Sequence, residues 1–134
     1  MTLFLDSSGL VARHIDFPGR AVVLDACAAE PDWCASVLAL TESLVLAERL
    51  SDDTTERDAL RRALRTDWER VAVVPVDQAC LDRAAELAAD HPLRVVDALH
   101  LAAADRLPGP VVYATFDDHQ IPVALALGFD VVSA

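Results

Sequence analysis

Four acidic residues that lie far apart in the sequence occupy matching places in the predicted secondary structure. Asp6 and Asp117 each end an apolar run that predicts a buried strand, and Glu42 and Asp97 lie in the first turns of predicted helices. Because parallel strands end at one edge of a sheet, Asp6 and Asp117 should share that edge. Glu42 begins its helix there, and Asp97 joins if its own helix points its N-terminus the same way.

Four clustered carboxylates point to chemistry with a hard divalent cation. Like charges raise one another's pKa, so without a cation some of these groups would have to take up protons. Mg²⁺ or Mn²⁺ suits oxygen ligands, and water and substrate phosphate complete the coordination shell. Two such ions roughly 4 Å apart activate a water and stabilise the leaving oxygen of a phosphodiester. The pattern therefore predicts metal-dependent phosphodiester hydrolysis.

Each acid also has a structural explanation. Asp6 and Asp117 are good helix N-caps, and the helix dipole favours Glu42 and Asp97 in a first turn. Taken singly, these explanations are at least as good as the functional one, but a chance gathering of all four at one edge is not expected. His100 lies three residues after Asp97 and is expected to be a packed histidine rather than a general base. His14 and His119 are expected to be surface residues.

The elements that must position these acids alternate between strand and helix. A helix follows Asp6 and is opened by Ser7, Ser8 and Gly9, and Gly128 is expected to end the last helix. The pattern predicts an α/β fold with a mainly parallel sheet and helices on both faces. Pro75 places its strand at an edge. Strands are expected at residues 3–5, 33–40, 71–76, 111–116 and 130–133, and the later helices at 18–30, 42–50, 55–68, 78–90, 95–107 and 117–127.

Composition narrows the class of protein further. The chain has 134 residues, the usual length of one domain (1–134), and a net charge of −11, with 22 acids against 11 bases that are all Arg. Such charge disfavours a simple nucleic-acid-binding module, but it is compatible with an enzyme whose carboxylates hold metal ions. Cys27, Cys34 and Cys80 lack zinc spacing and are expected to be buried or half-buried thiols. No membrane span or signal segment is seen, so the expected location is the cytoplasm.

The acids lie in segments that resemble PIN-domain proteins of the VapC toxin type. The matching segments are LFLDSSGLVA, LTESLVLAERL, RVVDALHLAAA and ATFDDHQIPVALALGFDVV, in family order over essentially the whole chain. The resemblance implies a three-layer α/β/α domain and a metal-dependent endoribonuclease, the toxin of a type II toxin–antitoxin pair. It also implies an RNA substrate, a cognate VapB-like antitoxin and a homodimer.

The resemblance also assigns roles to individual residues. Asp6, Glu42, Asp97 and Asp117 would form the catalytic acidic cluster, with Asp6 and Asp97 as the direct ligands of Mg²⁺, or of Mn²⁺ in its place. Thr115 would orient Asp117 and the waters of the site. The chain departs from many relatives at Asp118 and His119, where basic residues are common. An RNA-phosphate contact is thereby removed, and a ligand role for Asp118 is the less favoured alternative.

Other interpretations remain open. A catalytically silent PIN-like interaction module is the alternative from a different class. A phospho-receiver domain would need a lysine, which the chain lacks, and a haloacid-dehalogenase-type phosphatase would need an acid where Ser8 stands. An antitoxin segment is expected to insert an Arg or Lys among the four acids. Its apolar anchor would be a groove beside helices 42–50 and 55–68, which carry the leucines and Trp68.

Overall fold

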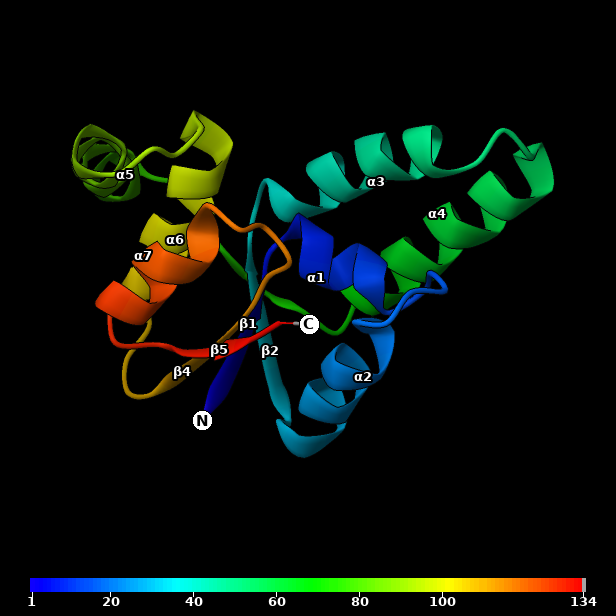
Figure 1. Cartoon of the computed structure of the whole chain (residues 1–134), viewed down its shortest axis with the longest axis horizontal. Coiled ribbons are helices and arrows are strands. Elements are labelled where there is room, and N and C mark those ends of the chain that lie inside the picture. Colours follow the sequence, from blue (N-terminus) through cyan, green and yellow to red (C-terminus); the bar gives the residue numbers. More distant parts are fainter. Residues whose placement is uncertain (134) are drawn as a thin grey trace.

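The computed structural model describes residues 1–133, and its centre is a parallel sheet (Figure 1). The strand order is β3-β2-β1-β4-β5, and every neighbouring pair is parallel. The described residues form the strands β1 (Thr2–Leu5), β2 (Asp32–Ser36), β3 (Ala72–Val74), β4 (Val111–Ala114) and β5 (Asp130–Val132). They form the helices α1 (Ser7–Ala12), α2 (Arg20–Ala29), α3 (Ala39–Leu50), α4 (Thr54–Trp68), α5 (Gln78–Asp90), α6 (Val95–Asp105) and α7 (Gln120–Ala126).

Helices cover both faces of the sheet, which confirms the predicted three-layer α/β fold. Successive side chains of a strand point to opposite faces, so Leu3 and Leu5 pack with α1 to α4, whereas Phe4 packs with α5 to α7. Figure 1 shows these two helical layers on the right and left of the sheet. Strands buried on both faces have continuous apolar sequences. This is why residues 3–5 are apolar at every position.

Stacked aromatic rings meet the small side chains of α6 in one half of the core. The ring centroids of Phe4 and Tyr113 are 5.3 Å apart, and those of Tyr113 and Phe129 are 5.7 Å apart. Residues 97–104 of α6 are all buried, and four of these eight are alanine: Ala98, Ala102, Ala103 and Ala104. The three cysteines are buried and free, as predicted.

Two predicted element boundaries were wrong, and both lie beside the acids. The predicted strand 33–40 ends at Ser36, and α3 already begins at Ala39 instead of residue 42. A short apolar run does not distinguish a strand from a buried helical turn. The predicted helix 117–127 begins only at Gln120, because Asp117 forms a turn whose side chain accepts a hydrogen bond from the His119 N–H.

The remaining boundaries are close to the predictions. The helix expected at 18–30 begins at Arg20, and β3 is an edge strand as Pro75 indicated. Gly128 follows α7 with a φ of +88°, the left-handed conformation that favours glycine after a helix. Among residues 1–133, no helix combines the length and apolar character needed to cross a membrane.

Gly9 allows α1 to press against the end of β4. A Cβ atom at this position would lie 2.8 Å from the carbonyl oxygen of Ala114, a distance that real Cβ atoms do not show. The Asp6 N–H donates to the same carbonyl. The close approach therefore joins the ends of β1 and β4, where Asp6 and Asp117 follow their strands.

Candidate active site

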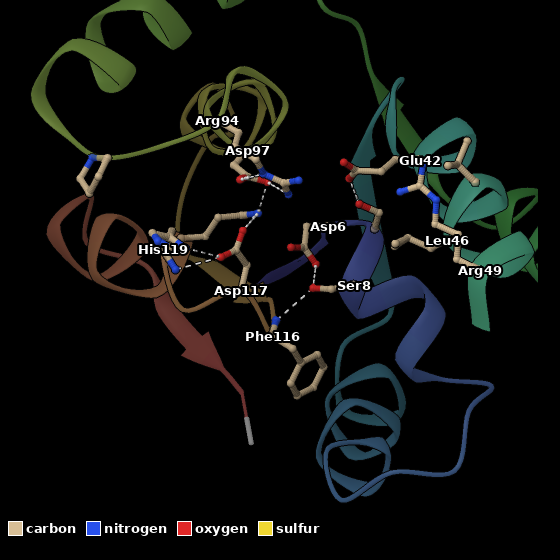
Figure 2. A pocket seen from close by; sticks show the side chains of 14 residues that line it. Asp6, Ser8, Glu42, Leu46, Arg49, Arg94, Asp97, Phe116, Asp117 and His119 are labelled. Carbon is tan, nitrogen blue, oxygen red and sulfur yellow. Dashed lines mark hydrogen bonds and ion pairs between the residues drawn. The ribbon is translucent and has the colours of Figure 1, made fainter. Parts of the chain in front are cut away.

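All four predicted acids line one cavity of about 540 Å³ at the carboxyl ends of β1 and β4 (Figure 2). Asp6 follows β1, Asp117 lies beyond β4, Glu42 comes from α3, and Asp97 comes from the first turn of α6. Asp6 and Asp97 are almost fully buried, with 1% and 2% of their surfaces exposed. The structure thus brings the predicted residues together, while their catalytic role stays a prediction.

Asp6 is both a helix cap and a cavity residue. One carboxylate oxygen accepts hydrogen bonds from the Gly9 N–H (2.8 Å) and the Ser8 hydroxyl (2.7 Å), which is the N-cap arrangement of α1. The other oxygen accepts from the Thr115 hydroxyl at 2.6 Å. Burial raises the pKa of Asp6 above its ordinary value, although these hydrogen bonds and His100 act in the opposite direction. A cation beside Asp6 would favour its charged form.

Hydroxyl groups connect Asp6 to the segment that carries Asp117. The Thr115 hydroxyl donates to Asp6 and accepts from the Asp117 N–H at 3.1 Å. The Ser8 hydroxyl similarly donates to Asp6 and accepts from the Phe116 N–H at 3.0 Å. Thr115 therefore positions the backbone of Asp117, in line with part of its predicted role.

Gln120, which the sequence analysis missed, links Asp97 to Asp117. Its buried amide nitrogen donates to Asp97 at 3.0 Å and to Asp117 at 3.3 Å. Its amide oxygen accepts from the Tyr113 hydroxyl at 2.6 Å. Ionised carboxylates can only accept hydrogen bonds, so the two acids fix the orientation of the Gln120 amide with its nitrogen toward them. A sequence signal existed, because Gln120 shares the buried face of α7 with Val123 and is the polar member of that face.

The pKa of Asp117 reflects these contacts. Partial burial acts to raise it, but hydrogen bonds from the His119 N–H and the Gln120 amide outweigh burial, and the pKa lies below its ordinary value. His119 itself is exposed, as predicted. Asp118 is also exposed and is not among the residues that line the cavity, so the geometry gives no support to a ligand role for it.

Glu42 lies across the cavity and is held by two neighbours. It accepts a hydrogen bond from the Ser7 hydroxyl and contacts His100 Nε2 at 2.9 Å. His100 is completely buried, and its Nδ1 lies 2.9 Å from the Ser36 hydroxyl. The prediction of a packed histidine is therefore confirmed, and the packing partner is one of the four acids.

Arg94 pairs with Asp97 at the mouth of the cavity. Its Nε and Nη2 atoms donate to the two carboxylate oxygens at 2.9 and 3.2 Å, while 76% of the arginine side chain is exposed. These hydrogen bonds raise the pKa of Arg94 above its ordinary value. The sequence analysis missed this pair, although the three-residue spacing in a helix is a signal for such contacts.

The chemistry of the donor set suits Mg²⁺ or Mn²⁺. The acids offer oxygen atoms alone, which hard divalent cations prefer, and burial of Asp6 favours a neighbouring positive charge. Among residues 1–133, however, no group of three or more Asp, Glu, His or Cys side chains is already arranged around one ion position. Arg94 and Gln120 occupy oxygens of Asp97, and Glu42 faces His100. A metal ion at Asp97 would therefore compete with the Arg94 guanidinium for this carboxylate.

A parallel α/β sheet with acids beyond its strand ends defines a class of protein whose ligands bind at that edge. The family is given by sequence: residues 3–125 match the PIN domain model, and the chain belongs to the PIN domain family. A comparison with curated proteins finds no match.

Solved structures share this fold at low sequence identity. A Mycobacterium tuberculosis structure, VapC20, described as a Sarcin-Ricin loop cleaving toxin, is 21% identical, with 90% of this chain and 94% of that chain covered and a TM-score of 0.71. VapBC2 from Rickettsia felis, bound to a promoter DNA fragment, is 12% identical over 100% and 99% of the two chains, with a TM-score of 0.70. FitAcB from Neisseria gonorrhoeae is 16% identical over 96% and 95%, also with a TM-score of 0.70.

Proposed function

We propose that this PIN-domain protein is a metal-dependent endoribonuclease and the toxin of a type II toxin–antitoxin pair. The observation that carries the proposal is the gathering of Asp6, Glu42, Asp97 and Asp117 from four separate elements around one cavity. The M. tuberculosis neighbour of the same fold, described as a toxin that cleaves the Sarcin-Ricin loop, supports RNA as the substrate class.

Asp6 and Asp97 would hold Mg²⁺ or Mn²⁺, and the bound ion would activate water and stabilise the leaving oxygen. The chain's own residues orient these ligands. Thr115 and Ser8 hold Asp6, and the Gln120 amide holds Asp97 and Asp117 at a fixed spacing. Loss of such supporting hydrogen bonds typically costs a metal site roughly 10- to 100-fold in affinity or activity. Asp6 and Asp97 are almost fully buried, and hydrogen bonds are stronger in such surroundings than in bulk water.

One observation favours a second candidate, the catalytically silent interaction module. Arg94 neutralises Asp97, and the acids described by the structure are not already arranged around an ion. In a silent module this arrangement would be permanent. In a nuclease it would be the metal-free state, from which the ion displaces the exposed guanidinium.

Metal dependence separates the two candidates. We expect purified protein to cleave a fluorescent single-stranded RNA in Mg²⁺ or Mn²⁺, and not in EDTA. Millimolar Mg²⁺ or Mn²⁺ should also raise the melting temperature, because an ion that binds only the native state stabilises it by mass action. Zn²⁺ should not be required, given oxygen ligands. Asp118→Asn is a matched control, since it removes an exposed acid outside the cavity. Cleavage and melting that ignore both metals would refute the proposal.

The partner we propose is a VapB-like antitoxin, and the protein would also form a homodimer. The support is that neighbours of this fold include a toxin–antitoxin complex from Klebsiella pneumoniae and VapBC-5 from Mycobacterium tuberculosis, a member of the VapBC family of toxin–antitoxin systems. A second cavity of about 530 Å³ lies between the end of α1, α3 and α4, where the sequence predicted an apolar groove. Its apolar lining consists of Ile15, Ala47, Leu50, Ala59, Leu60 and Ala63, whereas Trp68 packs into the core instead. A helix of the antitoxin would fit this groove.

The antitoxin would also insert a basic side chain among the four acids, where Arg94 already pairs with Asp97. We therefore expect association to be faster at low salt, because screening weakens attraction between opposite charges. High Mg²⁺ should weaken inhibition by competing for the same carboxylates. Stopped-flow mixing at several salt concentrations would measure the first effect, and inhibition titrations the second. An antitoxin that binds equally well when all four acids are neutralised would disprove insertion, although groove binding would survive.

A further inference from the structure

The substrate we propose is an anion, and the cavity that would bind it is acidic. The protein carries a net charge of −11, and two of the four cavity acids are almost fully buried. A metal ion offsets part of this charge at the scissile phosphate, but neighbouring phosphates of an RNA strand need other cations. Beside Asp117 the chain carries a further acid, Asp118, and His119, whose Nδ1 lies 3.4 Å from Asp117. A phosphate contact must therefore come from another wall of the cavity.

Two arginines and one histidine are among the residues that line the cavity: Arg49, Arg94 and His119. Arg94 is engaged by both oxygens of Asp97, and His119 Nδ1 lies 3.4 Å from Asp117. In the part of the chain that the structure describes, no carboxylate pairs with Arg49. Arg49 is therefore the cation of the cavity that remains available to a ligand.

Arg49 shares one face of α3 with Glu42. Glu42, Val45, Leu46 and Arg49 follow the spacing i, i+3, i+4 and i+7, and all four line the cavity. Figure 2 shows Glu42, Leu46 and Arg49 on the side of the cavity opposite Asp97 and Asp117. Seven helical residues rise roughly 10 Å, whereas stacked nucleotides are about 3.4 Å apart along a strand. Arg49 therefore reaches a phosphate other than the one held at the acids.

The surface between these two charged residues is apolar. Val45 is 44% exposed, and Leu46 is half-buried beside it. A base or ribose placed on these side chains would bury apolar surface while its backbone reached Arg49. The guanidinium offers two parallel donors that match phosphate oxygens.

We propose that Val45, Leu46 and Arg49 form a nucleotide subsite on α3, with Arg49 binding an RNA backbone phosphate other than the scissile one. The inference rests on the proposed ribonuclease function and adds the place where the strand continues beyond the acids. The subsite defines a path for the RNA strand across the cavity, from Asp97 and Asp117 past Asp6 and then along α3.

RNA binding by full-length protein tests the subsite. Asp6→Asn serves as the parent, so that the strand is not cut, and binding of a fluorescein-labelled single-stranded RNA is followed by anisotropy in Mg²⁺. Adding Arg49→Gln should weaken binding about 5- to 10-fold and lower the salt dependence of log K by about 0.7, the value for one phosphate contact on a single strand. Arg49→Lys should restore part of the affinity, because the charge returns without the paired donors.

Arg62→Gln is the matched control, because it removes an exposed arginine of α4 that does not line the cavity. It should bind RNA as the parent does. In the active background, Arg49→Gln should raise KM and leave kcat nearly unchanged, which loss of folding would not do. If Arg49→Gln and Arg62→Gln bind equally well, the subsite is wrong and the ribonuclease proposal stands. If the parent itself does not bind RNA, both proposals fail.

Discussion

The Asp6→Asn protein should fold, melt at a higher temperature than the wild type in EDTA, and cleave RNA more than about 100-fold more slowly. Loss of residues that merely support a metal ligand costs 10- to 100-fold, so loss of a direct ligand should cost more. The gain in stability follows from the burial of Asp6, which raises its pKa above 3.8. The ionised carboxylate opposes folding at neutral pH, and an asparagine still offers an acceptor to the Gly9 N–H that caps α1.

The pH dependence has a definite sign. Because the pKa of Asp6 is raised in the folded state, its contribution to stability is fully present below the ordinary pKa and is lost as pH rises through the folded value. The advantage of Asp6→Asn in EDTA should therefore be small in acid and larger at neutral pH. Thermal melts across that range and a cleavage time course measure both effects. Cleavage at a near-wild-type rate would remove Asp6 from the proposed site.

Asp67→Asn should destabilise the protein by about 2 kcal/mol, because it leaves a largely buried arginine without its carboxylate. Asp67 of α4 accepts from Arg13 Nε at 2.8 Å, and its Oδ2 lies 2.6 Å from His14 Nε2. The side chains of Arg13 and Asp67 are only 15% and 13% exposed. This contact joins α4 to the end of α1, the helix that Asp6 caps. Chemical denaturation would measure the loss.

Asp58→Asn on the same helix is the control. Asp58 is 50% exposed and its contact with Arg61 is long, so its loss should change the unfolding free energy by less than about 0.5 kcal/mol. Burial acts to raise the pKa of Asp67, but hydrogen bonds from His14 and Arg13 outweigh it and lower the pKa. The stability that Asp67 supplies is present above pH 3.8 and is lost as pH falls through the lower folded pKa. Equal effects of the two substitutions would contradict this assignment.

The sequence predicted the sheet and the four acids because both depend on local patterns. Apolar runs define the strands, and Asp6 and Asp117 follow such runs directly. Errors arose where local patterns were ambiguous. The run 33–40 contains both the end of β2 and the start of α3, and His14 was expected at the surface although it is half-buried against Asp67.

The residues that the sequence did not predict depend on tertiary packing. Gln120 meets Asp97 only because α7 and α6 lie against the same face of the sheet. His100 and Ser36 similarly come from segments 64 residues apart. Arg94 is the exception, since its contact with Asp97 is local and its spacing was visible in the sequence. The acids could therefore be located from sequence motifs, whereas most of the side chains that hold them could be identified only from the tertiary structure.

The two edge strands of the sheet are also its shortest. β3 and β5 have three residues each, and Pro75 follows β3 directly. An edge strand exposes unpaired backbone groups on which another chain can form a further strand, and short edges or a nearby proline limit that growth. Arg106 also donates to the Pro75 carbonyl at 3.2 Å, which occupies a backbone acceptor next to this edge. The sheet is thus protected against aggregation through its margins, and its helical faces are the surfaces left for ordered assembly.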